Sequence, residues 1–353
     1  MKRWIWIPVA VLAVLAVAGI VGELARDDGG PAPIPAAPTI NTDQAYESHP
    51  RTVFTYFFYW YEADTGAHLD QNSGLPVQLP PEPKPSWRSQ DWFEQQLRDM
   101  SDAGIDVALP VYWGDTEPWS VEALPILAAA KSKLDAEGSA PDIGLFFDTT
   151  ILDGRDLTLE ADRAYFYDEI RGFFDRIPRN QWASLDGRPV IWLYFSFFVR
   201  AFDQSSFDYL YDRFEADYDV RPYIVREVSW DFASRDGIVD ENRPIASEAN
   251  YKWGAALEGY FERGSVAAVG PGFDEREIPG RGGAHRPRED GNWYYQNFGK
   301  AIASGKRLLV IETWNEIHEA STICETVEHG RTYIDYTRRL VDEFRKYEPP
   351  AEP

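Results

Sequence analysis

The sequence is short of cysteine and of basic residues, and each shortage narrows the possible functions. Cys324 is the one cysteine, which excludes an intramolecular disulfide and a multi-cysteine metal site. The chain carries 35 Lys and Arg against 58 Asp and Glu, a formal net charge of −23. Such a surface repels phosphate backbones and anionic lipid head groups, which argues against nucleic acid as a partner. The plainest interpretation of this charge is solubility outside the cell.

Histidine motifs and glycine-rich nucleotide motifs are missing as well. The five histidines are scattered, and none forms an H-x-H or H-E-x-x-H pair, which argues against zinc. Neither G-x-G-x-x-G nor G-x-x-x-x-G-K-[ST] follows any apolar run, so a nucleotide cofactor lacks support. We therefore predict no metal site and no cofactor, while loop carboxylates leave room for calcium.

The start of the chain predicts export. Lys2 and Arg3 precede an uncharged apolar stretch, Trp4–Gly22, which is typical of an export signal and just long enough to span a membrane. Ala16-Val-Ala18 offers a cleavage site. Residues 1–25 are therefore either a signal peptide or, as we prefer, an uncleaved membrane anchor. Both interpretations place the remainder of the chain outside the membrane.

Composition divides the remainder into a linker, one domain and a tail. Residues 26–48 are rich in Pro and Ala, which favours an extended, semi-rigid spacer between membrane and domain. Residues 49–348 form the predicted globular domain, which is long enough for one large core. Residues 349–353 are predicted to be a frayed tail.

Short apolar runs alternate with helical patterns through the predicted domain. The predicted strands are Val53–Tyr59, Val107–Tyr112, Ile143–Asp148, Val190–Phe195, Tyr223–Val228, Ala249–Trp253, Val266–Gly270 and Leu308–Thr313. The predicted helices are Trp92–Ala103, Val121–Glu137, Ala161–Ile177, Phe207–Tyr218, Trp293–Ala303 and Thr326–Tyr347. Runs that are apolar throughout suit strands buried on both faces of a parallel sheet. Eight such units predict a (β/α)₈ TIM barrel, with an open doubly wound sheet as the alternative.

Polar and aromatic residues gather where the predicted strands end. In a barrel these ends form the active-site face. The candidate substrate-binding residues there are Tyr59, Trp60, Tyr112, Trp113, Asp148, Trp230, Trp253 and Asp274. Aromatic faces beside carboxylates suit sugars, and 15% of the chain is aromatic. An aromatic residue inside a strand is more often core, which is the interpretation we favour for Trp192 and Phe195.

The last predicted strand runs into a motif with two acids three positions apart, Glu316 and Glu319. On a helical turn their Cβ atoms would lie roughly 5–6 Å apart. Retaining glycosidases hold their two carboxyl groups about 5–5.5 Å apart. Close carboxylates also resist joint ionisation, which raises one pKa and keeps a proton available. An equally good interpretation from spacing alone is that Asn315 or Glu316 caps a helix N-terminus.

The motif and its surroundings resemble a known family. Trp314-Asn-Glu-Ile-His-Glu319 resembles the W-N-E-W-H-E motif of endo-α-mannosidase-like glycoside hydrolases, family 99. Val269-Gly-Pro-Gly-Phe-Asp274 is similar to the family's V-G-P-G-Y-D loop, and Arg281-Gly-Gly283 to the R-x-G segment after it. Tyr56–Tyr61 looks like the aromatic first strand. The resemblance covers the two ends of the domain better than its middle.

This resemblance implies a (β/α)₈ barrel that cleaves an α-linked polysaccharide internally, with retention and without a metal. Glu319 would be the general acid/base. Glu316 would act on the sugar 2-hydroxyl, which then displaces the leaving group and forms an anhydro-sugar. Arg281, Asn315 and His318 join the candidate substrate-binding residues.

The chain departs from the family pattern inside this motif. H-E-G-T becomes His318-Glu-Ala-Ser321, and the Trp within N-E-W-H-E becomes Ile317. These departures indicate a less characterised branch and leave the sugar open. Two alternatives stand beside the hydrolase: a non-catalytic carbohydrate-binding barrel, and a domain that acts in envelope polysaccharide assembly.

Overall fold

The computed structural model describes residues 50–69, 78–138, 140–235, 237–238, 245–262 and 264–347. The predicted signal or anchor, the linker and the tail lie outside these ranges, so they stay predictions. Among the described residues no helix is both long and apolar enough to cross a membrane.

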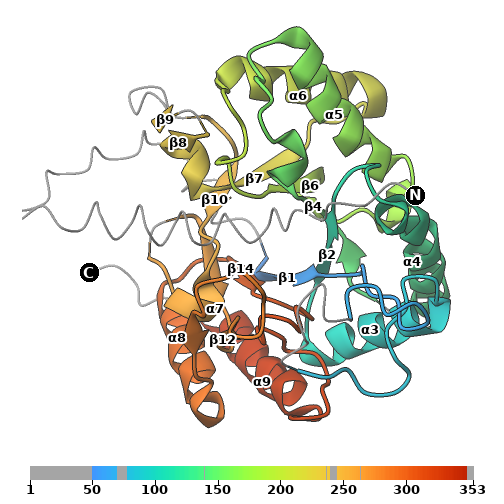
Figure 1. The fold of residues 1–353 in the computed structure, drawn as a ribbon, viewed down its shortest axis with the longest axis vertical. Helices are drawn as coiled ribbons and strands as arrows, with labels where there is room; N and C mark the ends of the chain where they lie inside the picture. Colours follow the sequence, from blue (N-terminus) through green and yellow to red (C-terminus); the bar gives the residue numbers. More distant parts are fainter. Residues whose placement is uncertain are drawn as a thin grey trace, which may run out of the picture.

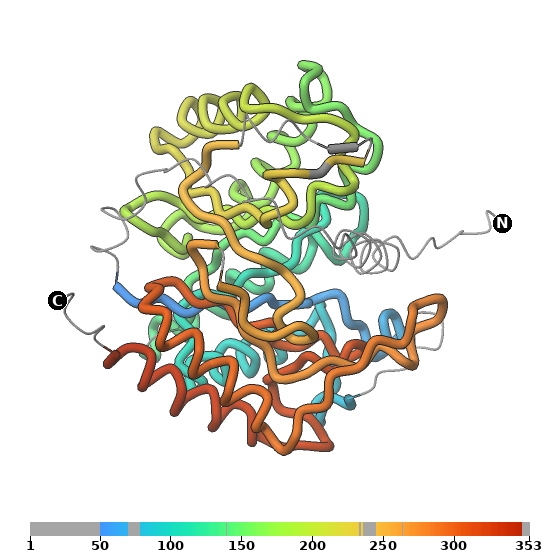
Figure 2. Tube along the Cα trace, turned by 90° about the vertical axis from the view of Figure 1, so that its left-hand side faces the viewer, coloured from blue at the N-terminus to red at the C-terminus, as the bar shows by residue number. Residues whose placement is uncertain are grey.

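Eight parallel strands make up the continuous path of a ten-stranded sheet, and they follow one another around it in chain order. The strands of this path are β1 (Thr52–Phe57), β2 (Val107–Tyr112), β4 (Leu145–Phe147), β6 (Arg188–Leu193), β7 (Tyr223–Glu227), β10 (Ala249–Tyr251), β11 (Val266–Val269) and β14 (Leu308–Ile311). β1 lies between β2 and β14 (Figure 1), with Thr52 opposite Leu308. Figure 2 shows the blue start of the domain beside its orange-red end. The first and last strands of the chain are thus neighbours, as a barrel requires. This confirms the predicted (β/α)₈ arrangement over the open doubly wound sheet.

The barrel has one weak seam, between β10 and β11, where no ladder of strand hydrogen bonds forms. Ser265 N–H donates to the Asn250 carbonyl at 3.1 Å, and Asn250 N–H donates to Ser265 Oγ at 2.8 Å. Two residues, one on each side, therefore bridge the gap that the strands leave.

Helices cover the outside of the sheet (Figure 1). They are α3 (Gln90–Ala103), α4 (Pro118–Glu137), α5 (Glu160–Phe174), α6 (Gln204–Tyr218), α7 (Ala255–Glu258), α8 (Asn292–Ala303) and α9 (Thr332–Lys346). Local signals fix their ends: Ser89 Oγ accepts the Trp92 N–H at the start of α3, and Gly104 ends that helix at φ 83°. The prediction that the last helix begins at Thr326 is wrong, because Gly330 N–H bonds to the Thr326 carbonyl in a separate turn.

Further short strands lie between these main elements. They are β3 (Asp142–Ile143), β5 (Ser184–Leu185), β8 (Ala233–Ser234), β9 (Gly237–Ile238), β12 (Phe273–Asp274) and β13 (His285–Arg286). β12 and β13 pair antiparallel in the long connection between β11 and α8, which carries the candidate site residues Asp274 and Arg281.

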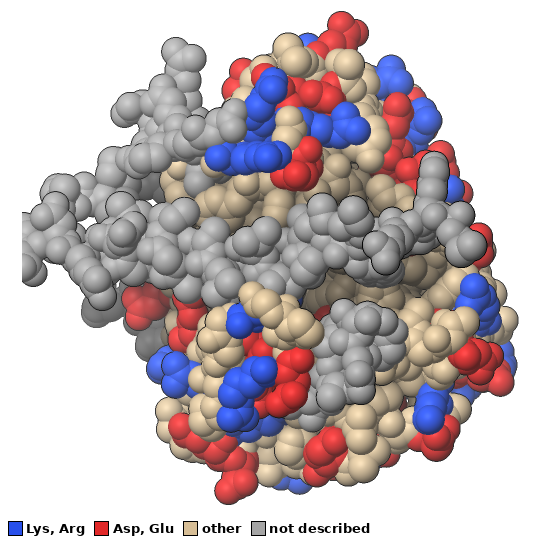
Figure 3. All heavy atoms as spheres, in the orientation of Figure 1, with Lys and Arg blue, Asp and Glu red and all other residues tan. Residues whose placement is uncertain are grey.

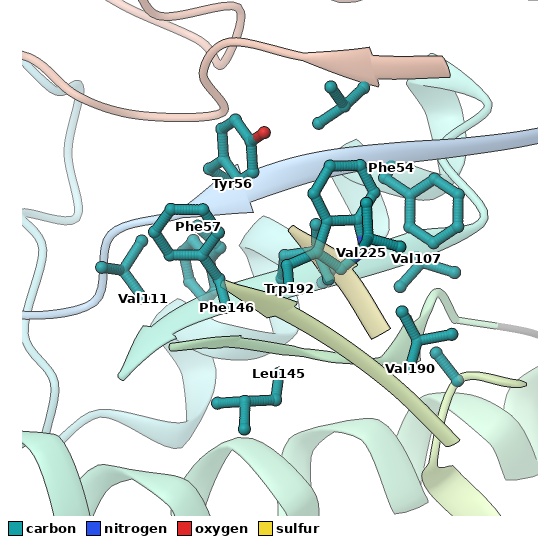
Figure 4. Close-up of a cluster of buried hydrophobic side chains, with 14 of the residues drawn as sticks. Phe54, Tyr56, Phe57, Val107, Val111, Leu145, Phe146, Val190, Trp192 and Val225 are labelled. Atoms are coloured by element: carbon teal, nitrogen blue, oxygen red, sulfur yellow. The ribbon is translucent and has the colours of Figure 1, made fainter. Parts of the chain in front are cut away.

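Aromatic side chains fill the interior of the barrel (Figure 4). Trp192 of β6 packs against Phe54 and Tyr56 of β1, with ring centroids 5.3 and 5.9 Å apart, and is fully buried. This confirms the core interpretation for Trp192. Trp253 lies above Tyr56 and Phe146, at 4.8 and 5.6 Å. The interior is therefore a packed column, and Trp253 closes it at the C-terminal end of the strands.

Candidate active site

The loop after β14 holds the paired acids in a turn. Thr313 organises it: its N–H donates to the Ser321 carbonyl at 2.8 Å, and its hydroxyl accepts the Glu316 N–H at 2.8 Å. Ala320 adopts a left-handed φ of 49°, the conformation that suits the glycine of the family pattern. The next helix, α9, begins only at Thr332, so the interpretation of Glu316 as a helix cap is wrong.

Glu316 is a residue of this turn and is only 4% exposed. Its Oε1 accepts the backbone N–H of His318 at 3.0 Å and contacts His318 Nδ1 at 2.9 Å. The His318 ring in turn stacks on Tyr61, with centroids 6.0 Å apart. Glu316 is thus held on one oxygen, while His318 positions this acid.

Glu319 is paired with a cation. Arg281, from the loop between β12 and β13, donates to Glu319 and lies 3.3 Å from Glu275. Burial raises the pKa of Glu319, Arg281 opposes that rise, and the nearby Glu316 adds to it. The net effect is an acid that holds its proton more tightly than an ordinary Glu, which suits a proton donor near neutral pH.

A small cavity of about 60 Å³ joins Glu319 to the barrel core. Trp253, Phe195, Phe273 and Leu257 form its apolar walls, and Glu312, Thr313, Ser321 and Glu258 contribute polar atoms beside Glu319. Gly270 lets the chain segments of Ala256 and Glu312 approach each other beside the cavity, because a Cβ there would lie 2.5 Å from both Ala256 Cα and the Glu312 carbonyl oxygen. An aromatic wall beside several carboxyl groups matches the chemistry expected for a sugar.

A second group of candidate residues lies where β1 and β2 end. Trp60 and Trp113 are half-buried, with centroids 5.3 Å apart, and Trp60 stacks on His68 at 4.7 Å. Asp148 follows β4, where its carboxylate accepts the Thr150 N–H at 3.0 Å. Burial raises the pKa of Asp148. These three residues lie at the predicted face and keep their place as candidates.

Three predicted substrate contacts are wrong. Tyr59 is buried and donates its hydroxyl to the Ser120 carbonyl at 2.9 Å. Tyr112 is fully buried and packs on Phe173 of α5, 5.5 Å away. Trp230 is 0% exposed, and its indole donates to the Tyr194 carbonyl. All three face the helix layer, where no substrate can reach them.

Asn315 and Asp274 have partners inside the protein. The amide of Asn315 accepts the Phe58 N–H at 2.8 Å and donates to the Phe58 carbonyl at 2.7 Å, so it ties the acid loop to β1. The Asp274 carboxylate binds Arg276 at 2.6 and 2.8 Å, which lowers the pKa of Asp274. Its N–H donates to the Glu319 carbonyl at 2.6 Å. Both residues therefore hold the loop that carries the acids.

Two further acids of this face escaped the prediction. Glu312 directly follows β14 and lines the cavity, and Glu227 ends β7 and accepts the Trp253 N–H at 3.5 Å. Burial raises the pKa of Glu312 to about 8 and that of Glu227 to about 7. Both lie at strand ends, the signal that had selected Asp148 and Asp274, so the same signal could have found them.

Charged side chains around this face carry both signs. Figure 3 shows Lys and Arg interspersed with Asp and Glu rather than gathered in one patch. Among the described residues no group of three or more His, Cys, Asp or Glu side chains has the arrangement of a metal site.

Fold and site together define a (β/α)₈ barrel with an acidic, aromatic-walled cavity at the C-terminal ends of its strands. The fold is that of the family 99 glycoside hydrolases. The GH99 endo-α-mannosidase from Bacteroides thetaiotaomicron superimposes with a TM-score of 0.65 at 15% identity, covering 84% of this chain and 98% of that one. A glycoside hydrolase-like protein gives 0.64 at 14% identity, covering 90% and 97%.

The chain belongs to the family described as "Domain of unknown function (DUF5010)", which matches residues 39–353. No curated protein matches the sequence. The structural likeness thus confirms the predicted family 99-like fold.

Proposed function

We propose that the protein is a retaining, endo-acting glycoside hydrolase that cleaves an α-linked polysaccharide, with α-mannose as the favoured sugar. The observation that carries the proposal is that Glu319 and Trp253 line the same cavity. Glu316 lies on the same turn as Glu319. Glu319 offers a proton for the leaving oxygen, Trp253 offers a surface for the apolar side of a pyranose, and Glu316 is the second acid that retaining cleavage needs.

Glu319 acts as general acid and then as general base in this proposal. In the first step it protonates the glycosidic oxygen, so its proton must be retained near neutral pH. Burial and the neighbouring Glu316 both raise the pKa of Glu319 in the required direction. Once Glu319 has lost its proton, Arg281 stabilises the carboxylate that must later deprotonate water.

Glu316 acts on the 2-hydroxyl of the sugar. Its Oε1 is engaged by His318, which orients the carboxylate and leaves Oε2 to take the proton. The 2-oxygen then attacks the anomeric carbon as the leaving group departs with the proton of Glu319. Water opens the resulting anhydro-sugar, Glu319 takes a proton from this water, and Glu316 returns its proton to the 2-oxygen. Two inversions at the anomeric carbon give net retention.

We further propose that the hydrolase works outside the membrane, either anchored by residues 1–25 or secreted. The basic start and the apolar stretch Trp4–Gly22 support this. A reporter fused after Pro38 should be active only outside the cytoplasm, and activity confined to the cytoplasm contradicts the proposal.

The test of the activity is a screen of the purified protein against α-mannans, α-glucans and envelope glycans. The matched variant is Glu319→Gln, which keeps the side-chain volume and removes the acid. Turnover of a substrate with a poor leaving group should fall by about 10²–10⁴-fold. Glu325→Gln, which removes a half-buried acid paired with Arg331 away from this cavity, should not reproduce that loss. Equal turnover by a folded Glu319→Gln protein refutes the acid assignment.

A further inference from the structure

Arg288 has a buried guanidinium group that the reaction proposed above does not use. It lies between β13 and α8, and its guanidinium packs over the Tyr333 ring, 4.2 Å from the centroid. Gly272 makes room for its stem, since a Cβ there would lie 2.8 Å from Arg288 Cγ. Its Nε and Nη1 atoms are buried and have no hydrogen-bond partner among the described residues. Burying a cation in this way costs free energy, so the contacts that the group does make call for an explanation.

A single nitrogen, Nη2, makes the hydrogen bonds of Arg288, and these bonds converge on the turn that carries the acids. Nη2 donates to the carbonyl oxygens of Ala320 and Thr322, at 2.8 and 2.7 Å. It also donates to Gln78 Oε1 at 3.1 Å. Gln78 holds the same turn, since its N–H donates to the Ile317 carbonyl at 3.2 Å and its Oε1 accepts the Thr322 hydroxyl. Arg288 is therefore part of a clamp on the acid turn.

The hydrogen bonds from Arg288 alternate with backbone hydrogen bonds along this turn. The carbonyl of Glu319 accepts the Asp274 N–H at 2.6 Å, and that of Ser321 accepts the Thr313 N–H at 2.8 Å. Arg288 holds the carbonyl that lies between these two and the one that follows them. Four consecutive carbonyl groups, starting with that of the acid itself, are thus fixed in place.

Ala320 is the residue that needs this hold. Its φ of 49° is left-handed, a conformation that the Cβ of an L-residue disfavours and that glycine adopts freely. Relative to glycine, an alanine with nothing to hold it should populate this conformation about five- to tenfold less. Ala320 directly follows Glu319 in the chain, so a change of its conformation would redirect the acid.

We propose that Arg288 is a positioning residue that holds Ala320 in its left-handed conformation and so keeps the Glu319 carboxyl group directed at the glycosidic oxygen. This inference rests on the proposed function, because it takes Glu319 as the proton donor. It also gives a physical meaning to the alanine, which departs from the glycine of the family pattern: alanine requires a hold here that glycine does not.

The first test compares two leaving groups on one sugar. kcat/KM of the full-length protein is measured with phenyl and with dinitrophenyl α-mannobioside. Dinitrophenolate departs with little help from an acid, so a misdirected Glu319 should slow cleavage of the phenyl substrate far more. Arg288→Met should lower kcat/KM on the phenyl substrate about five- to tenfold, and on the dinitrophenyl substrate less than about twofold. Adding Ala320→Gly should restore most of the lost activity.

Arg345→Met is the matched control. The guanidinium of Arg345 also donates to a backbone carbonyl, that of Gly104 at 2.9 Å, but Arg345 contacts neither the acid turn nor the cavity. This variant should change neither value of kcat/KM. Arg288→Lys, which keeps a cation beside Tyr333 but offers one ammonium group to two carbonyls, should show the pattern of Arg288→Met with a smaller loss. An equal loss on both substrates, or a loss that Ala320→Gly does not restore, overturns the proposal.

Hydrogen exchange separates this inference from the proposed function. The Thr313 N–H reports on the turn without any substrate, because its acceptor, the Ser321 carbonyl, lies between the two carbonyls that Arg288 holds. Its exchange should be about five- to tenfold faster in Arg288→Met than in the parent, and should slow again when Ala320→Gly is added. Arg345→Met should exchange this proton at the parental rate.

The two failures are distinguishable. If no variant cleaves either mannobioside, the proposed α-mannoside substrate is refuted, and exchange of the Thr313 N–H alone decides the inference. If Arg288→Met leaves that exchange rate unchanged, the inference fails whatever the substrate.

Discussion

Replacing Glu312 with Gln should make the protein more stable at alkaline pH. The pKa of Glu312 is raised from 4.5 to about 8 by burial, so the folded state keeps a proton that the unfolded state releases. Below about pH 4.5 the residue is neutral in both states and contributes nothing. Between pH 4.5 and 8 the free energy of unfolding falls as pH rises, and above pH 8 the loss is complete.

The magnitude follows from the size of the pKa shift. The difference between a pKa of 4.5 in the unfolded chain and about 8 in the folded protein corresponds to about 5 kcal/mol. The side chain is almost fully buried, so solvent screening takes little from this value. Glutamine has no charge to bury and still offers an oxygen to the N–H groups of Gly254 and Ala256. We therefore expect Glu312→Gln to exceed the parent by about 3–5 kcal/mol at pH 8.5 and to match it at pH 4.5.

Urea unfolding at several pH values, followed by tryptophan fluorescence, measures this difference. Subtracting the parent from the variant cancels every group that titrates alike in both proteins, including Glu227. The difference should rise steadily from pH 4.5 to 8 and then level off. A difference that is flat with pH would refute the assignment of a neutral Glu312, even if the variant were more stable throughout.

Three further predictions concern the site and its neighbours. Arg281→Met removes the cation that lowers the pKa of Glu319, so the alkaline limb of the plot of kcat/KM against pH should move to higher pH. Arg281→Lys keeps a cation and should move this limb less. A limb that moves in neither variant would show that Arg281 does not act on Glu319. Trp230→Ala should cost about 3–5 kcal/mol in urea unfolding because it empties a buried site, and a change below 1 kcal/mol would contradict its place in the core. Proton NMR of the first product should show retention of anomeric configuration on α-mannan oligosaccharides and little cleavage of α-glucans. The reason is that the 2-oxygen is trans to the leaving group in an α-mannoside and cis to it in an α-glucoside. An inverted product or efficient α-glucan cleavage would exclude the 2-hydroxyl mechanism.

Apolar runs in the sequence were enough to predict the barrel. Leu308-Leu-Val-Ile311 is apolar throughout and forms β14 at those residues, because a strand covered on both faces needs no alternation. Strand ends were harder to place. The prediction ran β10 to Trp253, whereas the strand ends at Tyr251 and Trp253 turns over the barrel instead.

The candidate site was only partly predictable, because the direction of a side chain depends on tertiary packing. Tyr112 and Trp113 are adjacent and equally aromatic, yet one packs on α5 and the other reaches the open end of the barrel. Likewise, Glu312 became a candidate only when the structure placed Gly254 and Ala256 against it. Sequence separation of 58 residues hides such a contact from any local pattern.

The seam between β10 and β11 is where we expect the barrel to open locally. The turn that carries Trp253 crosses the top of this join: Glu227 of β7 accepts the Trp253 N–H at 3.5 Å, and Glu312 of β14 accepts that of Gly254. We therefore expect the Trp253 side of the cavity and this least-bonded edge of the sheet to open together. Amide exchange of Ser265 and Gly254 should be faster than that of β1 and should slow together when a ligand fills the cavity, which would make local breathing of the barrel a direct report on occupancy.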